Sequence, residues 1–367
     1  MDLRGAVERA IRRLDAMADL SLLEPPPLAA GPDLRGDHPG FPLRARARDD
    51  ALAAIDRGET RYVDGAGIAP LREAIGGVLQ RIGIEADAEK GLIVTAGEQE
   101  ARFLALQALA AAGRRLVFPS VVHPGARKAA ALNAAGRQVL PLDLTTGAPD
   151  PGAVRAALAA GGPAALYLES PNRFTGKVIP PELLAALADE ARRVGAFLVW
   201  DASLAAWVPD DVPYFTPARA EYRERTIALG TVWAGAGVEG WMIGYLTLPA
   251  EVYPHARRLK QVMALCTSVP VQWGTLGVLL EGDVGHAGHL QTLAEVKAAA
   301  VRVWPGKVLP GEAVSLLAVD WPDAASVPTP ARGMAGTVFG VPGWIRFTVT
   351  ATGEIVTALR ALAGSGT

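Results

Sequence analysis

Four residues stand where an α/β protein could use them for chemistry. Asp201 ends an apolar strand-like run, and active sites in parallel sheets lie at the carboxyl ends of strands. Arg346 lies inside the alternating run W-I-R-F-T-V, where a buried arginine is costly unless it meets an anion. Gly97 and Glu98 form a turn that leads into a helix and would present backbone N–H groups to an anion. The pattern predicts an anion-binding or proton-transfer site.

Short apolar runs alternate with helical patterns from residue 92 onward, which predicts a parallel α/β sheet. The expected strands are 92–95, 116–119, 139–142, 165–168, 197–201, 314–319 and 344–349. The expected helices are 1–20, 49–57, 181–194 and 250–265. Residues 35–50 are charged and interrupted by proline, which predicts a loop.

Composition restricts the class of protein. A chain of 367 residues, half of them hydrophobic, can bury one large core and a smaller one. A net charge of −2 gives no basic field for nucleic acid. The first residues lack a signal-peptide pattern, and no apolar run reaches the ~18 residues of a membrane span. The single Cys266, expected to be buried, excludes an internal disulfide and a cysteine metal cluster. We therefore expect a soluble, cytoplasmic, metal-free protein that binds neither nucleic acid nor membranes.

The segment from Leu229 to Tyr245, L-G-T-V-W-A-G-A-G-V-E-G-W-M-I-G-Y, resembles the class I/II aminotransferases. These fold type I enzymes use pyridoxal phosphate (PLP), and their segment runs roughly G-S-F-S-K-x-F-G-x-x-G-W-R-x-G-Y. An ungapped match places Thr231 and the glycines on family positions. It also places Ala234 at the lysine that forms the Schiff base, and Met242 at the arginine that binds the cofactor phosphate.

Further motifs resemble the family in the same order. Tyr62 begins Y-V-D-G-A-G-I-A-P-L-R, and the family tyrosine reaches the cofactor phosphate of the partner subunit, which implies a homodimer. The segment E-S-P-N-R-F-T-G resembles N-P-N-N-P-T-G, with Arg173 in place of the asparagine that binds the phenolic oxygen. Asp201 matches the aspartate that binds the pyridine nitrogen, and Leu204 replaces a nearby tyrosine. Arg346 matches the arginine that binds the substrate α-carboxylate.

Other positions leave two interpretations open. Gly31 is either a substrate-side glycine or a turn glycine, and His123 either replaces the aromatic residue that stacks on the pyridine ring or is a loop histidine. Gly97, Glu98 and Gln99 lie in the turn that holds the phosphate in the family. The Glu98 carboxylate would oppose that anion if it points inward; as a first-turn acid it would face solvent. Lys177 is expected to face solvent.

The resemblance implies a fold with a large unit and a small one. We expect an N-terminal helix and arm over 1–45, a large domain with a mostly parallel seven-stranded sheet over 46–255, and a smaller α+β domain over 256–367.

Standard transamination is not expected, because it needs a lysine amine that alanine cannot supply. In a first reading the pocket binds or converts a small amino-acid-like carboxylate without a Schiff base. Arg346 and Arg173 would then anchor it, His123 and Asp201 would transfer protons, and Trp233 would close the lysine side. In a second reading the pocket holds PLP or its pyridoxamine form noncovalently, with His123 as the base. In a third the protein is an inactive subunit that pairs with an active relative. We also predict that Arg173 reaches into the cofactor volume and pairs with Asp201, directly or through one water.

Overall fold

The computed structural model describes residues 32–133, 135–217, 222–321 and 332–364. Its centre is a seven-stranded sheet with the strand order β1-β9-β8-β7-β6-β2-β3. Only β9 runs antiparallel to its neighbours, so the sheet is mostly parallel, as predicted. The strands are β1 (Leu92–Ala96), β2 (Arg115–Pro119), β3 (Arg137–Leu140), β6 (Ala164–Glu169), β7 (Phe197–Asp201), β8 (Thr226–Gly230) and β9 (Ile243–Thr247). The helix predicted over 1–20 and Gly31 lie outside the described residues.

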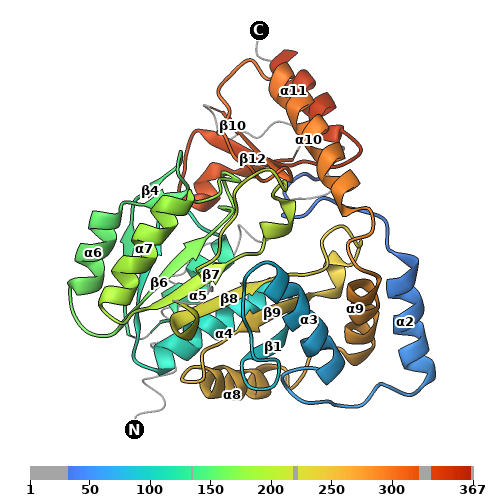
Figure 1. Cartoon of the computed structure of the whole chain (residues 1–367). Coiled ribbons are helices and arrows are strands. Elements are labelled where there is room, and N and C mark those ends of the chain that lie inside the picture. Colours follow the sequence, from blue (N-terminus) through green and yellow to red (C-terminus); the bar gives the residue numbers. More distant parts are fainter. Residues whose placement is uncertain (1–31, 134, 218–221, 322–331, 365–367) are drawn as a thin grey trace, which may run out of the picture.

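Helices cover both faces of this sheet, because alternate strand residues point to opposite sides (Figure 1). On β7, Phe197 and Val199 share an apolar cluster with α4, α5 and α8, whereas Leu198 and Trp200 share one with α3, α6, α7 and α9. The helices are α2 (Ala45–Asp56), α3 (Ala69–Arg81), α4 (Gly97–Ala111), α5 (Pro124–Ala131), α6 (Pro151–Ala159), α7 (Pro181–Arg193), α8 (Tyr253–Met263) and α9 (Val269–Glu281).

A smaller unit surrounds an antiparallel sheet of order β10-β12-β11, seen at the top of Figure 1. Its elements are α10 (His286–Val303), β10 (Leu316–Asp320), β11 (Met334–Ala335), β12 (Trp344–Thr348) and α11 (Glu354–Gly364). Leu290 of α10 belongs to the apolar cluster of this unit, whereas Val269 and Val278 of α9 belong to that of the large sheet. The division predicted at residue 255 stays a prediction; we propose that the small unit begins after α9.

Several elements differ from the sequence-based expectation. The strand expected over 139–142 is divided at Pro141, which has no N–H to donate: β3 precedes it, and β4 (Leu142–Asp143) pairs with β5 (Ala148–Pro149) instead. The loop expected over 35–50 ends earlier, at the start of α2. Helices α3, α5, α9, α10 and α11 were not predicted. In α9, Gly274 lets the helix approach α2 closely, because a Cβ there would meet the Ala47 carbonyl oxygen at 2.6 Å.

Two further properties concern single features of the chain. Cys266 is half-buried, rather than buried as predicted, and it follows the end of α8. Within the described residues, no helix combines the length and the apolar character that a membrane span requires.

Candidate functional site

Two carboxylates lie side by side at the carboxyl edge of the large sheet. Glu169 ends β6, Asp201 ends β7, and the strand register makes them partners. Both are buried, with 3% and 0% of their surface exposed. Burial and the neighbouring Asp201 raise the pKa of Glu169 to about 8, so it is protonated at neutral pH. Two adjacent buried carboxyls cannot both ionise freely, and Asp201 is the one that does.

Asp201 is ionised because Arg102 of α4 is its counter-ion. The Nε of Arg102 donates to Oδ2 of Asp201 at 2.6 Å, and its Nη2 lies 3.4 Å from Oδ1. The Tyr167 hydroxyl donates to Oδ2 at 2.6 Å, and the amide and hydroxyl of Ser203 donate to Oδ1. Burial opposes the charged form, but Arg102 and Arg173 keep the pKa of Asp201 below its ordinary value. Both carboxylate oxygens are therefore engaged.

Arg173, in the loop after β6, contacts other carboxylates. Its Nη2 donates to Glu98 Oε2 at 2.9 Å, and its Nη1 lies 3.7 Å from Asp37 Oδ2. The prediction that Arg173 pairs directly with Asp201 is wrong, because Arg102 takes that position. Of the two interpretations of Glu98, the structure agrees with the inward one, because its side chain is only 11% exposed. Burial opposes ionisation of Glu98, yet Arg173 and His38 lower its pKa.

Arg346 of β12 is fully buried and meets an anion, although that anion comes from the same chain. Its Nη1 donates to Asp37 Oδ1 at 2.6 Å. Its remaining acceptors are the backbone carbonyls of Arg173, Arg35 and Gly36. Burial opposes the charged form of Asp37, but Arg173 and Arg346 hold its pKa well below the ordinary value. Asp37 thus neutralises the arginine that was expected to meet a ligand.

His123 caps the first turn of α5 and lies between acidic groups. Its Nδ1 accepts the Gly125 N–H at 3.0 Å, and its Nε2 lies 3.4 Å from Asp37 Oδ2. Its own backbone N–H donates to Glu169 Oε2. Burial and the Arg102 cation lower its pKa to about 4, so the ring is neutral at pH 7. This geometry assigns the proton to Nε2 and leaves neither ring nitrogen with a free lone pair.

The buried guanidinium groups of the site are paired. Each guanidinium has an ionised carboxylate beside it, while Glu169 is neutral at pH 7. The charged groups are Arg102, Arg173 and Arg346 with Asp37, Glu98 and Asp201. Buried charges are tolerated where they are paired in this way.

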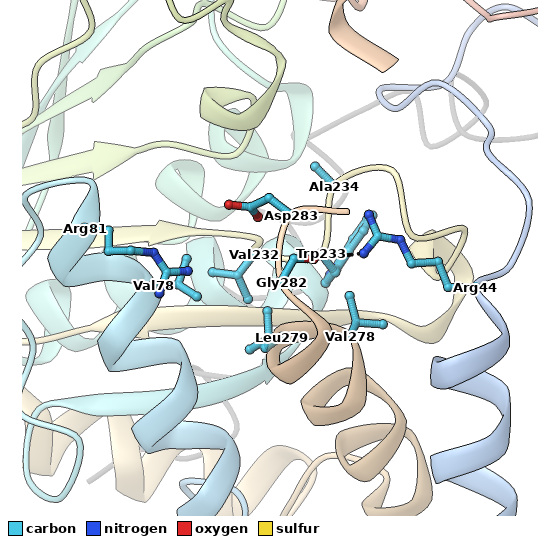
Figure 2. Close-up of a pocket in the computed structure, with 10 residues that line it drawn as sticks. All are labelled: Arg44, Val78, Arg81, Val232, Trp233, Ala234, Val278, Leu279, Gly282 and Asp283. Carbon is cyan, nitrogen blue, oxygen red and sulfur yellow. Dashed lines mark hydrogen bonds between the residues drawn. The ribbon is translucent and has the colours of Figure 1, made fainter. Parts of the chain in front are cut away.

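Trp233 and Ala234 border a small cavity between α3 and α9 (Figure 2). Its volume is about 20 Å³, which is room for about one water molecule. Trp233 is 3% exposed and its indole N–H donates to the Ile243 carbonyl. Ala234 is half-buried and packs against the apolar cluster of the small unit. Little open space therefore remains beside Ala234, and charged residues such as Arg44 and Asp283 line part of it.

Comparison with known proteins places the chain in a family. The family model for aminotransferase class I and II matches residues 33–291. The chain belongs to the class I and II aminotransferases. It is 30% identical over 260 residues to the aspartate/prephenate aminotransferase of Thermus thermophilus, which is 69% of this chain and 66% of that protein. A probable N-succinyldiaminopimelate aminotransferase of Mycobacterium tuberculosis is 30% identical over 240 residues, 64% of this chain and 59% of that protein.

Solved structures of aminotransferases share the whole fold. The N-succinyldiaminopimelate aminotransferase of M. tuberculosis superposes with a TM-score of 0.85 at 24% identity, covering 96% of this chain and 98% of the other. The aspartate aminotransferase of T. thermophilus with maleate gives 0.83 at 24% identity and the same coverage. These likenesses establish the fold type I architecture.

The remaining aminotransferase positions lie around the charged cluster or on the surface. Met242 has φ 55° and covers the first turn of α4, because a Cβ on Gly97 would lie 2.9 Å from its Cε. Tyr62 is 83% exposed. Leu204 is buried in the apolar cluster of the small unit. The other predicted residues are Thr231, which is buried, Gln99, which is exposed, and Lys177, which is half-buried and paired with Glu312.

Sequence reasoning singled out none of Glu169, Tyr167 and Ser203, and it also missed Arg102, Asp37 and His38. Arg102 carried a usable signal: it interrupts the apolar run of α4 and lies four residues after Glu98, on the same helix face. Asp37 and His38 carried none, because they belong to a charged segment without periodicity. Only the tertiary structure brings that segment onto Arg346.

Proposed function

We propose that this aminotransferase homologue binds a small, amino-acid-like carboxylate without forming a Schiff base. The observation that carries the proposal is the Asp37 carboxylate on Arg346, next to Arg173. A guanidinium that already holds one carboxylate in bonding geometry can hold another of the same chemistry. The position also matches that of the substrate-carboxylate arginine in the family.

The absence of a suitable lysine supports the noncovalent part. In the ungapped family match, Ala234 stands at the lysine position. The lysines closest to the family motifs in sequence are each paired with a carboxylate: Lys177 with Glu312 and Lys260 with Glu100. Neither is among the side chains that contact Asp201.

The side chains at the cofactor positions do not fit PLP. A pyridine N–H needs a free oxygen on Asp201, and both oxygens already accept hydrogen bonds from Arg102, Tyr167 and Ser203. A phosphate needs the open first turn of α4. Met242 covers that turn, and the inward carboxylate of Glu98 repels an anion there.

Ligand binding on this proposal is an exchange of carboxylates. Asp37 is the exchangeable partner, since it is 29% exposed whereas Arg346 is fully buried. The other acceptors of Arg346 are backbone carbonyls, which stay in place. A ligand carboxylate would bind Arg346 and Arg173, and the released Asp37 carboxylate would be available to a ligand ammonium. A zwitterionic amino acid offers both groups.

Calorimetric titration tests this exchange with L-aspartate, succinate and maleate, and with succinamide as the uncharged control. Asp37→Asn removes the internal competitor and should tighten the binding of succinate and maleate, which carry no ammonium group. Arg346→Lys loses the contacts with backbone carbonyls that orient the guanidinium, and should weaken carboxylate binding by roughly tenfold, the equivalent of about one charged hydrogen bond. Weaker binding of succinate by Asp37→Asn, or equal binding of succinamide and succinate, would contradict the exchange.

The same protein preparation tests the proposal that no Schiff base forms. Incubation with PLP followed by borohydride reduction should leave no stoichiometric adduct in the peptide mass map. A single-site adduct, for example at Lys177 or Lys260, would contradict it. An absorbance band of bound cofactor without an adduct would favour noncovalent PLP or its pyridoxamine form instead. The engaged ring nitrogens of His123 argue against that histidine as its base.

A second candidate function is an inactive subunit that completes an active relative. Tyr62 favours it, because this aromatic side chain is 83% exposed at the position of the tyrosine that reaches the partner subunit in the family. Native mass spectrometry after co-expression with an active class I/II aminotransferase of the same genome tests the idea. A mixed dimer supports it, and only self-dimers would support the homodimer predicted from the sequence.

A further inference from the structure

We infer that Arg102 is a built-in substitute for the pyridine nitrogen of the cofactor and is the residue that excludes it. This inference rests on the proposed function, since it explains why the chain would hold no PLP. It assigns the exclusion to a residue of α4 that no family motif identifies.

The geometry around Arg102 resembles that of a bound ligand. The guanidinium is 1% exposed and presents Nε and Nη2 to the two oxygens of Asp201. Its Nη2 also donates to the Ser203 hydroxyl at 2.8 Å and lies 3.5 Å from Glu98 Oε2. A planar cation held by an aspartate at the end of β7 occupies the position that a protonated pyridine ring would require.

The charges around Asp201 lead to the same conclusion as the hydrogen-bond geometry: Arg102 excludes the cofactor. A buried aspartate is stable only beside a cation, and removing one member of such a pair costs several kcal/mol. In the family the pyridine nitrogen is the partner of that aspartate. Here Arg102 takes that role: burial opposes its charge, but Asp201 and Glu98 raise the pKa of Arg102 well above its ordinary value. Asp201 is therefore paired without any ligand, and a second cation at Asp201 would be repelled.

The Asp201 oxygens leave no room for both cations. Oδ2 already accepts from Arg102 and from Tyr167, each at 2.6 Å. Oδ1 accepts from Ser203 through its amide and its hydroxyl. A ring nitrogen reaches Asp201 only when the Arg102 guanidinium leaves, and Arg102 is also held by Ser203 and Glu98. Exclusion therefore follows from competition for one carboxylate.

The test removes the cation and supplies one from solution. Arg102→Met keeps the length of the side chain without charge, and Arg102→Gln keeps a donor for Asp201. The double variant Arg102→Met with Asp201→Asn is the matched control, because it removes the acceptor along with the cation. Pyridoxamine and PLP are the probes, with binding measured by equilibrium dialysis and by the shift in unfolding temperature.

We expect wild type and the double variant to bind neither probe at millimolar concentration. Arg102→Met should bind pyridoxamine at least tenfold more tightly than wild type and should unfold at a higher temperature in its presence. PLP should gain no more than pyridoxamine, because Glu98 and Met242 disfavour its phosphate.

Each outcome decides the question. If Arg102→Met and Arg102→Gln fold but, like wild type, bind neither probe at millimolar concentration, Arg102 does not exclude the cofactor, while the proposed function stands. If wild type itself binds both probes at that concentration, the proposed function fails as well. If the variants fold poorly, their refolding yield with and without pyridoxamine gives the same comparison, and an unchanged yield overturns the inference.

Discussion

Arg346→Lys tests how much of the site's stability depends on one guanidinium. Arg346 donates to the Asp37 carboxylate and to three backbone carbonyls, those of Arg173, Arg35 and Gly36. A lysine keeps the charge and the bond to Asp37, but its single nitrogen cannot reach carbonyls on two segments. Loss of two buried hydrogen bonds costs about 3 kcal/mol. For a chain of 367 residues, this lowers the unfolding temperature by about 4 °C.

Circular dichroism gives the unfolding temperature, and amide hydrogen exchange shows where the protein loosens. Exchange should accelerate at the Leu34 and Thr348 amides, which pair the 33–38 segment with the small unit, and should stay unchanged in β7. Arg48→Lys is the control, because Arg48 is 59% exposed and contacts only a neighbouring carboxylate. An unfolding temperature within one degree of wild type, with unchanged exchange, would refute the reasoning.

Three further substitutions have defined expectations. Glu169→Gln should flatten the pH dependence of the free energy of unfolding. In wild type the folded pKa of Glu169 is about 8 against an ordinary 4.5, so the free energy of unfolding falls as pH rises between those values. Urea unfolding at pH values near both ends of this range measures the loss. Lys260→Met should destabilise by about 3–5 kcal/mol, measured the same way, because its buried carboxylate partner remains unpaired. Gly97→Ala should lower the unfolding temperature more than Gly58→Ala; both have positive φ, but only the first meets Met242.

Local sequence patterns predicted five strands of the large sheet, whereas β8 and β9 were expected only through the family resemblance. The run that ends at Asp201 is apolar up to that residue, and such a run is buried on both faces wherever it lies. The strand that carries Arg346 was predicted from its alternating pattern, but the antiparallel pairing of the small sheet was not. In contrast, α9 was missed because its glycines and all-round apolarity hide a helix that is packed against α2.

The candidate site was predictable in some of its positions but not in its pairings. The strand end predicted Asp201 at the carboxyl edge, and Glu169, which was not predicted, lies beside it because parallel strands end on the same side of a sheet. Which arginine contacts Asp201 depends on the directions of side chains from β7, from α4 and from the loop after β6. Arg173 follows β6 directly, yet Glu98 and Asp37 attract it away. Arg102 reaches Asp201 from α4, which is distant from β7 in the sequence but close to it in the fold.

Ala234→Lys places a lysine at the position that matches the family's Schiff-base lysine. We expect that this substitution does not allow a Schiff base with PLP to form. The cavity beside Ala234 has a volume of about 20 Å³, whereas a lysine adds four non-hydrogen atoms beyond the alanine side chain. Overpacking there should destabilise the chain by about 1–3 kcal/mol. The pyridine nitrogen of PLP would still find Asp201 paired with Arg102. Borohydride reduction with PLP should therefore leave the introduced lysine unmodified, as judged by peptide mass mapping. A stoichiometric adduct at position 234 would show that the pocket accepts the cofactor with Arg102 in place, and would contradict the inferred role of Arg102.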